Sequence, residues 1–444
     1  MSPNPSDIET TKKVVDDITH STLSKKKNGM DKAPDGGFRA WLITAGTACI
    51  FFSTLGFANS FGIFEQYYLS HQLKDESADK VAWIGSLAAF LQFAAGALGG
   101  PLFDRYGAWV CSSISRKDQL LTRKKVIRPA AIMYLFAMVM TSLCKQYWQF
   151  MLAQGILLGT SMGLLQFPAM AAVIQHFDKN IAAALGAAVS GSSIGGVVIP
   201  IALSKMLNST SLGFGWSVRI IGFVVTPLLA FSCLAVKSRL QPRKTKFFIA
   251  SAFKTPKFSL LVAAIFFMFL GFFTPLFYIP TYAVSRGVDT TLASYLLAIL
   301  NAASTFGRVI PGVLADKFGR LNVLSMGGIL TGIIIFCMNQ AKSTPALIVY
   351  SIAFGFWSGT IISGATAAFS IVIPDPRTIG TYLGTGMGVA SLASLIGPPV
   401  NGALLNKYGG FSEISIFSGA MCVLGGFLTL ATKTTTSQGL LGRV

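Results

Sequence analysis

Charged residues are scarce in this chain, and acidic residues are the scarcest of them. Only 12% of its 444 residues are charged, 17 of them acidic and 36 basic, whereas a soluble globular domain carries roughly 25% charged residues. Hydrophobic residues make up 52% of the chain. So little polar surface excludes a sizeable soluble catalytic domain and fits apolar helices of about 20 residues that cross a bilayer. The composition therefore predicts a multi-pass membrane protein.

Cysteine and histidine are also few, and neither is clustered. The three histidines lie far apart, and the six cysteines show no CxxC or Cys/His ligand spacing, so neither a zinc site nor a disulfide framework is indicated. Glycines recur at 155, 159 and 163, and at 384, 386 and 388, inside apolar stretches with no strand before them. This pattern favours close helix packing over a nucleotide-binding loop. We expect no metal, no cofactor and no enzymatic activity.

The first 34 residues have no apolar run, so no cleavable signal peptide is expected there. Their polar, mixed-charge composition predicts a disordered cytoplasmic tail. The formal net charge of +19 is carried by short loops between apolar stretches, where it sets the orientation in the membrane. No basic face with interleaved aromatics is present, and we expect the bilayer rather than a nucleic acid as a partner.

Twelve apolar stretches follow the tail, each a candidate transmembrane helix. They lie at about 38–64, 82–103, 127–144, 148–172, 181–205, 215–236, 258–280, 290–315, 321–339, 345–373, 379–405 and 411–432, with boundaries good to a few residues. The expected fold class is an all-α membrane protein.

The loops predict how the chain is oriented. The loop at 237–257 holds seven basic residues and no acidic one. The loop after the first stretch holds Glu65, Asp75, Glu76 and Asp79 against Lys74 and Lys80. Because positive charge stays on the cytoplasmic side, we expect the basic loop and both termini in the cytoplasm, and the plasma membrane as the location.

A repeated motif divides the chain into two halves. Residues 100–107 read Gly-Pro-Leu-Phe-Asp-Arg-Tyr-Gly, and residues 312–320 read Gly-Val-Leu-Ala-Asp-Lys-Phe-Gly-Arg. Both follow the second apolar stretch of a set of six, which indicates duplication and a pseudo-twofold axis normal to the membrane. We expect a six-helix bundle at 35–236, a cytoplasmic basic linker at 237–257, a second six-helix bundle at 258–432 and a cytoplasmic tail at 433–444.

Residues 111–126 form a strongly basic segment where a tight loop is expected. Removing it would lengthen the third stretch, which otherwise looks short for a span. Two interpretations stay open: a translated intron or lineage insertion, and a long cytoplasmic loop.

The duplicated motif in a six-plus-six chain resembles the major facilitator superfamily. Residues 35–41 (Asp-Gly-Gly-Phe-Arg-Ala-Trp) are similar to the signature of its monocarboxylate porter branch, with one extra residue, and residues 177–195 are similar to that branch's span-five pattern. The resemblance implies a secondary transporter that works by alternating access around a site between its halves. No phosphate-binding motif accompanies it, so a gradient is expected to supply the energy.

The resemblance also implies which residues bind the cargo. Arg308 matches the arginine of span eight, whereas Ser304 replaces the aspartate of proton-coupled porters and Asn59 replaces their lysine. A guanidinium within a span costs about 2.5–3.5 kcal/mol on insertion scales and suits a carboxylate or enolate; the alternative is a structural pair with a neighbouring helix. Asn301, Ser304 and Arg308 share one helix face. Asn59 is either a ligand or a hydrogen-bonding contact between helices.

Aromatic and loop residues complete the candidate site. Phe354, Trp357, Ser358 and Tyr278 could contact an aromatic ligand, although such aromatics also serve as packing residues. The resemblance implies that five charged residues gate the contact between the halves: Asp104, Arg105, Asp316, Lys317 and Arg320. The alternative is that their charges only set the topology. Asn208 begins a glycosylation sequon on the expected outer side.

Together these features predict a transporter of a small organic acid or acidic metabolite. The missing coupling residues favour export of a secondary metabolite over lactate-type symport. Two alternatives stay open: uptake of a monocarboxylate or riboflavin-like nutrient, and a membrane sensor that transports nothing. The sequence does not indicate an oligomeric state.

Overall fold

The computed structural model describes residues 33–106, 126–240, 249–373 and 375–436, together with residues 439 and 442. Most of the expected N-terminal tail, nearly all of the basic segment at 111–126 and part of the linker at 237–257 lie outside the described residues. The two interpretations of the basic segment therefore stay open.

The first half of the chain folds into helices that join into longer spans. Their bounds are α2 Phe38–Ser53, α3 Leu55–Ala58, α4 Phe61–Ser70, α5 Ala78–Ala94, α6 Gly96–Tyr106, α7 Ile127–Thr141, α8 Tyr147–Phe150, the π-helix η1 Met151–Leu158, α9 Gly159–Ile174, α10 Ile181–Ser209 and α11 Gly213–Ala235. Helices α2 to α4 together form one span, Phe38–Ser70.

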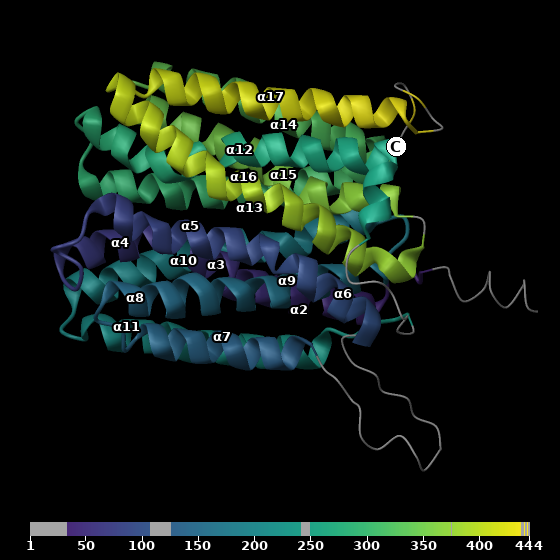
Figure 1. Cartoon of the computed structure of the whole chain (residues 1–444), viewed down its shortest axis with the longest axis horizontal. Helices are drawn as coiled ribbons and strands as arrows, with labels where there is room; N and C mark the ends of the chain where they lie inside the picture. Colours follow the sequence, from purple (N-terminus) through teal and green to yellow (C-terminus); the bar gives the residue numbers. More distant parts are fainter. Residues whose placement is uncertain are drawn as a thin grey trace, which may run out of the picture.

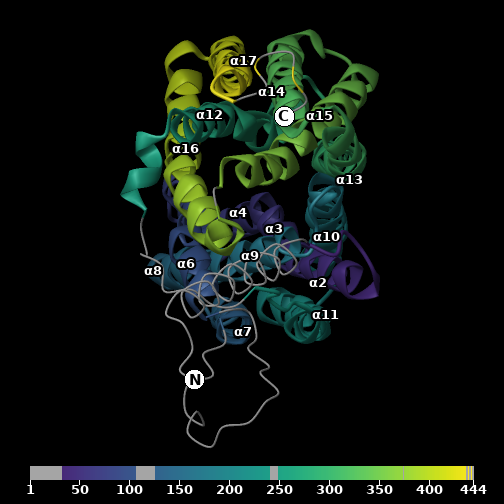
Figure 2. The ribbon, with the colours of Figure 1, turned by 90° about the vertical axis from the view of Figure 1, so that its right-hand side faces the viewer.

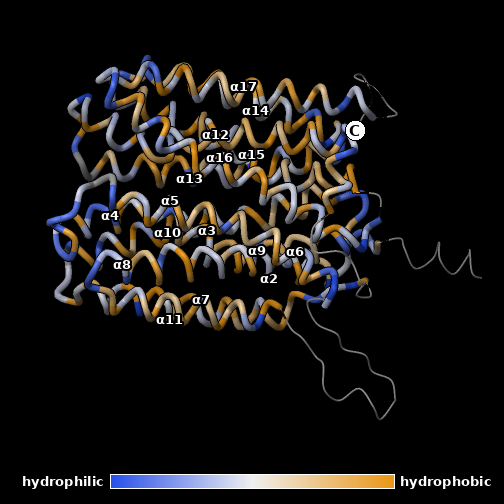
Figure 3. Tube along the Cα trace, in the orientation of Figure 1, coloured by the Kyte–Doolittle hydropathy of each residue, from blue (hydrophilic) through white to orange (hydrophobic). Residues whose placement is uncertain are grey.

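The second half contains fewer interruptions. Its helices are η2 Ala250–Lys254, α12 Pro256–Ser285, α13 Thr290–Phe318, α14 Arg320–Phe336, η3 Cys337–Gln340, α15 Thr344–Val372, η4 Pro376–Thr378, α16 Ile379–Tyr408 and α17 Ser412–Thr434. The helices lie nearly side by side (Figure 1). They carry an apolar band between two polar ends (Figure 3), as expected for a bilayer.

Eleven helices in the described part of the chain are long and apolar enough to cross a membrane. The predicted third span corresponds to α7, whose 15 described residues extend about 22 Å against a hydrocarbon core of about 30 Å. The residues before Val126 are not described. The all-α class is confirmed, and the predicted boundaries fall within a few residues of the helices except at the end of the first span.

The first span is longer than predicted. Glu65 was expected in the loop after it, but α4 continues to Ser70. The carboxylate of Glu65 is therefore carried by a membrane helix. The apolar stretch ends in sequence at residue 64, whereas hydrogen bonds of the helical backbone continue past the first charged residue.

The helices form two bundles, α2–α11 and α12–α17, which occupy the lower and upper parts of the view along the helices (Figure 2) and meet where α10 lies beside α13. Glycines bring them close. A Cβ built on Gly384 would lie 2.0 Å from the carbonyl oxygen of Gly96, and one on Gly186 would lie 2.3 Å from that of Arg308. The bundles thus meet backbone to backbone, and the glycines at 384, 386 and 388 serve helix packing as predicted.

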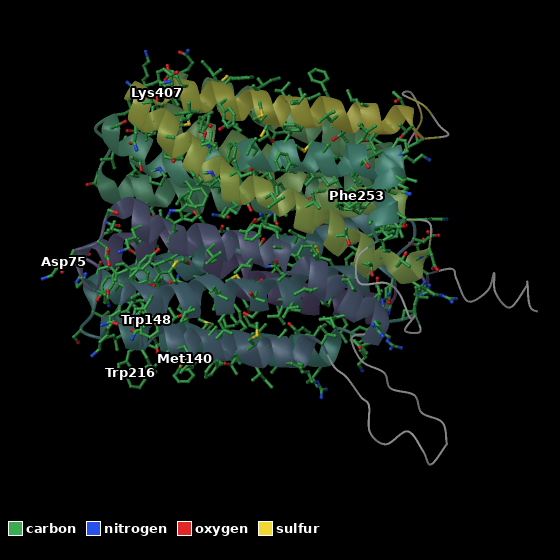
Figure 4. All side chains as sticks on the ribbon, in the orientation of Figure 1. Asp75, Met140, Trp148, Trp216, Phe253 and Lys407 are labelled. Atoms are coloured by element: carbon green, nitrogen blue, oxygen red, sulfur yellow. The ribbon has the colours of Figure 1, made fainter. Side chains whose placement is uncertain are left out.

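The two ends of the molecule are named by their residues. The terminal face carries the start of α2 at Phe38 and the end of α17 at Thr434. The far face carries Asp75 and Lys407, which both lie at the opposite end of the helices, at the left of Figure 4.

Candidate functional site

A cavity of about 460 Å³ lies between the two bundles. Its wall comes from α3, α4, α5, η1, α9 and α10 in the first half and from α12 and α13 in the second. Most of the wall is apolar and includes Phe61, Phe93, Phe273 and Phe277. The cavity extends toward the far face, where the exposed Asn208 at the end of α10 lines it.

A smaller pocket of about 40 Å³ forms the floor of this cavity and shares part of its lining. Five of the residues predicted to bind cargo line this pocket together: Asn59, Asn301, Ser304, Arg308 and Ser358. The last four are nearly fully buried. The predicted helix face of α13 thus points toward the interface between the halves.

Asn59 and Asn301 connect the halves at the floor. The side-chain nitrogen of Asn59 donates to the side-chain oxygen of Asn301 at 3.2 Å. Asn59 lies at the break between α3 and α4, and interrupted helices are common where a transporter binds its cargo. Both interpretations of Asn59 fit this geometry, because the contact joins two helices and lines the floor at once.

Arg308 crosses the interface and contacts α10. One terminal nitrogen donates to the carbonyl oxygen of Val189 at 3.0 Å and to the hydroxyl of Ser192. Its Nε has no partner among the described residues, and no ion pair of Arg308 is recorded within that part of the chain. A buried guanidinium held only by neutral groups keeps its charge uncompensated at the floor of the cavity.

The structure does not bring three predicted residues to the cavity lining. Phe354 is fully buried and packs against the ring of Phe272, with 6.4 Å between ring centroids. Trp357 contacts Phe356 edge to face. The hydroxyl of Tyr278 donates to the carbonyl oxygen of Pro398 at 3.3 Å. The physical reason is the rotation of their helices, which turns these rings away from the cavity, while α13 and one side of α12 face it.

Buried glutamines in the first bundle form a polar wall that was not predicted as a site. Gln92, which lines the cavity, donates to Gln166 at 3.3 Å, and Gln166 donates to the hydroxyl of Thr54 at 2.7 Å. Gln154 lines the cavity from the π-helix and accepts from the hydroxyl of Tyr68 at 2.7 Å. Isolated glutamines within apolar stretches were the available signal, since a buried amide needs partners.

At the terminal face, two carboxylates hold the halves together reciprocally. Asp104 at the end of α6 accepts from the backbone N–H groups of Gly380 at 3.0 Å and Thr381 at 2.6 Å, at the start of α16. Asp316 near the end of α13 accepts from the N–H groups of Ala182 at 3.1 Å and Ala183 at 2.8 Å, at the start of α10. A helix N-terminus favours a negative charge. We call these two contacts the latch.

Arg320 extends the latch. It donates to Asp316 at 3.3 Å, to the hydroxyl of Ser370 at 2.8 Å and to the carbonyl oxygen of Asp178 at 3.1 Å, which lies in the other half. The other two predicted gating residues are placed differently. The guanidinium of Arg105 lies 5.7 Å from the ring centre of Tyr106, and Lys317 is exposed. Gating by all five of these residues stays a prediction.

The signature at residues 35–41 supports the same corner of the terminal face. One carboxylate oxygen of Asp35 accepts from the N–H groups of Asp178 at 2.9 Å, Lys179 at 2.7 Å and Asn180 at 3.3 Å, directly before α10. Burial raises the pKa of Asp35, but the three donors and the charge of Lys179 outweigh it and lower the pKa below its usual value. This role was not predicted from the sequence.

Asn208 lies in the last turn of α10 at the far face, and its side-chain nitrogen donates to the hydroxyl of Ser204 at 3.4 Å. Its glycosylation stays a prediction.

Comparison with known proteins identifies the family. The model of the Major Facilitator Superfamily matches residues 46–338 and 302–440. The aspyridones efflux protein of Emericella nidulans is 47% identical over 91% of this chain and 80% of its own length. The agnestins efflux protein of Paecilomyces divaricatus is 36% identical over 98% of this chain and 97% of its own.

Solved structures agree on the fold. The human organic anion transporter MFSD10 superposes with a TM-score of 0.68 at 14% identity, over 89% of this chain and all of that one. The transporter FucP in its outward conformation gives 0.65 at 15% identity, over 88% and 99%.

This chain therefore belongs to the Major Facilitator Superfamily of membrane transporters. The predictions of that superfamily and of a transporter rather than an enzyme are confirmed.

Proposed function

We propose that this protein exports a fungal secondary metabolite with an acidic group by alternating access, across the plasma membrane, with both termini in the cytoplasm. The observation that carries the proposal is the guanidinium of Arg308 at the floor of an aromatic-lined cavity of about 460 Å³. Relatives named for efflux of aspyridones and agnestins support the direction and the cargo class. We keep the monocarboxylate-porter-like branch as part of the proposal, on the strength of the signature at residues 35–41.

The size of the cavity favours a metabolite larger than lactate. Pockets for drug-sized ligands measure about 300–1,000 Å³, and this cavity falls within that range. Phe61 and Phe273 offer apolar surface to a carbon skeleton, while Asn59, Gln92 and Asn301 offer amide groups to its oxygens. A three-carbon acid would leave most of this wall without contacts.

Arg308 links the two halves, so an acid that binds to Arg308 can alter the interface between them. The guanidinium donates to Val189 and Ser192 on α10, in the opposite half. An acidic group on the cargo is a stronger acceptor than a neutral carbonyl or hydroxyl oxygen. When the cargo takes over these donors, α10 loses its tie to α13 at the floor, and the two halves are freer to move against each other.

The structure is closed at the terminal face and hollow toward the far face. In our proposal the terminal face is cytoplasmic, so this state has an outward-open cavity from which exported cargo leaves. Opening toward the cytoplasm requires that Asp104 leaves the start of α16 and Asp316 leaves the start of α10. The latch thus sets the balance between the two states.

Deletion of the gene tests the function in the producing fungus. Deletion cells should retain acidic metabolites that wild-type cells release, and a plasmid copy should restore release. A copy with Arg308→Gln should not restore release, whereas Arg219→Gln should. Arg219 is the matched control because it is also an arginine within a span and donates to a serine, Ser142, at 3.1 Å, but does not line the cavity. Equal release by wild-type and deletion cells would contradict export.

A further inference from the structure

One acidic side chain lines the cavity among the described residues, and it is Glu65 on α4. The side chain is half-buried. No hydrogen bond or ion pair to its carboxylate is recorded within the described part of the chain. The same cavity wall includes Phe61 and Phe277. An ionised carboxylate in such a wall depends on water in the open cavity for its solvation.

Other charged and titratable groups lie on the helix of Glu65 and on the elements that pack against that helix or face it across the cavity. They are Lys205 on α10 and Tyr295 on α13, which line the same cavity, Lys80 on α5, Tyr147 on α8, Arg219 on α11, and Tyr67, Tyr68 and His71 on α4. Lys80 is bound to Glu76 at 2.7 Å, Tyr68 donates to Gln154, and His71 is exposed and stacks on Tyr67. Lys205 is therefore the one cationic group that shares the cavity with Glu65 in this part of the chain.

Alternating access changes the hydration of the Glu65 carboxylate. When the terminal face opens, the far-face ends of α4 and α10 approach those of α12 and α13, and water leaves the space around Glu65. Removing an ionised carboxylate from water without a partner is strongly unfavourable, whereas the neutral acid is tolerated. The closing movement is therefore linked to protonation.

We propose that Glu65 is a proton-binding site that couples transport to a proton gradient: the far-face cavity closes only after the carboxylate takes up a proton. The proton comes from water at the far face and forms one O–H bond on the carboxylate. Once the cavity has opened on the terminal side, the proton leaves along the polar floor to water there. The carboxylate that remains is destabilised in the closed far-face end, which favours return to the outward-open state. Each turn thus moves one proton inward against one exported cargo molecule. This inference rests on the proposed function and names its energy source.

The position of Glu65 allows this passage. It follows Asn59 by six residues, or about 9 Å along a helix, so it lies close to the polar floor that both orientations of the cavity share. The aspartate and lysine of proton-coupled relatives are replaced by Ser304 and Asn59. Glu65 supplies a titrating group at a different place on the wall, next to α10 instead of on α13.

The first test measures the conformational response without cargo. Spin labels on Lys179→Cys and Arg377→Cys, both exposed at the terminal face in opposite halves, report whether that face is closed, in a chain without its native cysteines. In wild type, the label distance should shift toward longer values between about pH 8 and about pH 5. In Glu65→Gln, which imitates the neutral acid, long distances should dominate at both values. Glu76→Gln, the matched carboxylate outside the cavity, should respond as wild type does.

Two results of this test overturn the proposal. One is a wild-type distance that does not change with pH, as expected if Lys205 pairs with Glu65 on closing. The other is a Glu65→Gln protein that responds to pH as wild type does, because the response then arises from a different group. Either result removes Glu65 as the proton site.

The second test measures flux in proteoliposomes with aspyridone as the probe. Wild-type protein should exchange aspyridone at equal pH and accumulate it in vesicles with an acidic lumen, with proton efflux seen by a trapped dye. Glu65→Gln should exchange aspyridone at equal pH as wild type does, but its gradient-driven accumulation of aspyridone should be lower by about tenfold or more. Accumulation at the wild-type level would overturn the coupling alone. If wild-type protein exchanges no aspyridone, the proposed cargo fails instead, and the label distances still decide the role of Glu65.

Discussion

Asp104 and Thr381 belong to different halves of the molecule, yet the carboxylate of Asp104 accepts from both the backbone N–H of Thr381 at 2.6 Å and its hydroxyl at 2.7 Å. Asp316 makes the corresponding contact in the opposite direction, from the second half to Ala182 and Ala183 of the first. The repeated motif thus places one carboxylate from each half on a helix N-terminus of the other. The pseudo-twofold symmetry read from the sequence is expressed as a reciprocal contact.

The latch should respond to loss of one charge. Asp104→Asn removes the negative charge at the start of α16 while preserving size, and charge-assisted hydrogen bonds contribute about 1.5–3 kcal/mol each. We expect the population open at the terminal face to rise by about tenfold or more, since 1.4 kcal/mol is a factor of ten. Distances between labels at residues 179 and 377 measure it. A distribution identical to wild type would show that the contact does not hold the closed state.

Close contact of the glycine backbones should be needed for the state that is closed at the terminal face. Gly384→Ala places a methyl group 2.0 Å from the carbonyl oxygen of Gly96, so the halves must separate locally, and such overpacking costs about 1–3 kcal/mol. Transport should fall, and the protein should melt at a lower temperature. Gly222→Ala is the matched control, because nothing lies within 4 Å of a Cβ at that position on α11. Equal loss in both variants would contradict the role of the contact.

Asp35 should stabilise the terminal face independently of pH in the physiological range. Its pKa is lowered in the folded protein, so its contribution is complete above the ordinary carboxyl value of about 4 and is lost only as pH falls through the lowered folded value. Asp35→Asn should therefore reduce the melting temperature by a similar amount at about pH 6 and about pH 8. A reduction that vanished at the lower of these values would refute this assignment.

The architecture could be predicted from the sequence because several independent patterns indicate the same fold. Apolar length located the spans, and the duplicated motif located the halves. The spacing of Asn301, Ser304 and Arg308 placed them on one face of α13, which the structure turns toward the floor pocket. These features depend on local periodicity or on repetition, both of which one chain carries.

The positions of other side chains depend on how helices rotate against their neighbours. Phe354 and Trp357 lie on α15, whose apolar residues are spread around the whole helix, so the sequence does not mark which of its aromatic rings face the cavity. Glu65 was assigned to a loop because a charge at the end of an apolar stretch resembles a helix end. The contact of Asp35 with residues 178–180 joins segments more than 140 residues apart, which no local pattern reveals.

The central claim is that Arg308 recognises an acidic group on the cargo, and paired substrates test it most directly. Uptake into proteoliposomes at equal pH is measured for a panel of labelled fungal metabolites that includes aspyridone, with each acidic member paired with its methyl ester. Wild-type protein should prefer an acid over its ester by about tenfold or more, and Arg308→Gln should transport both at the same low rate. An Arg308→Gln protein that retained the full preference for the acid would contradict the account.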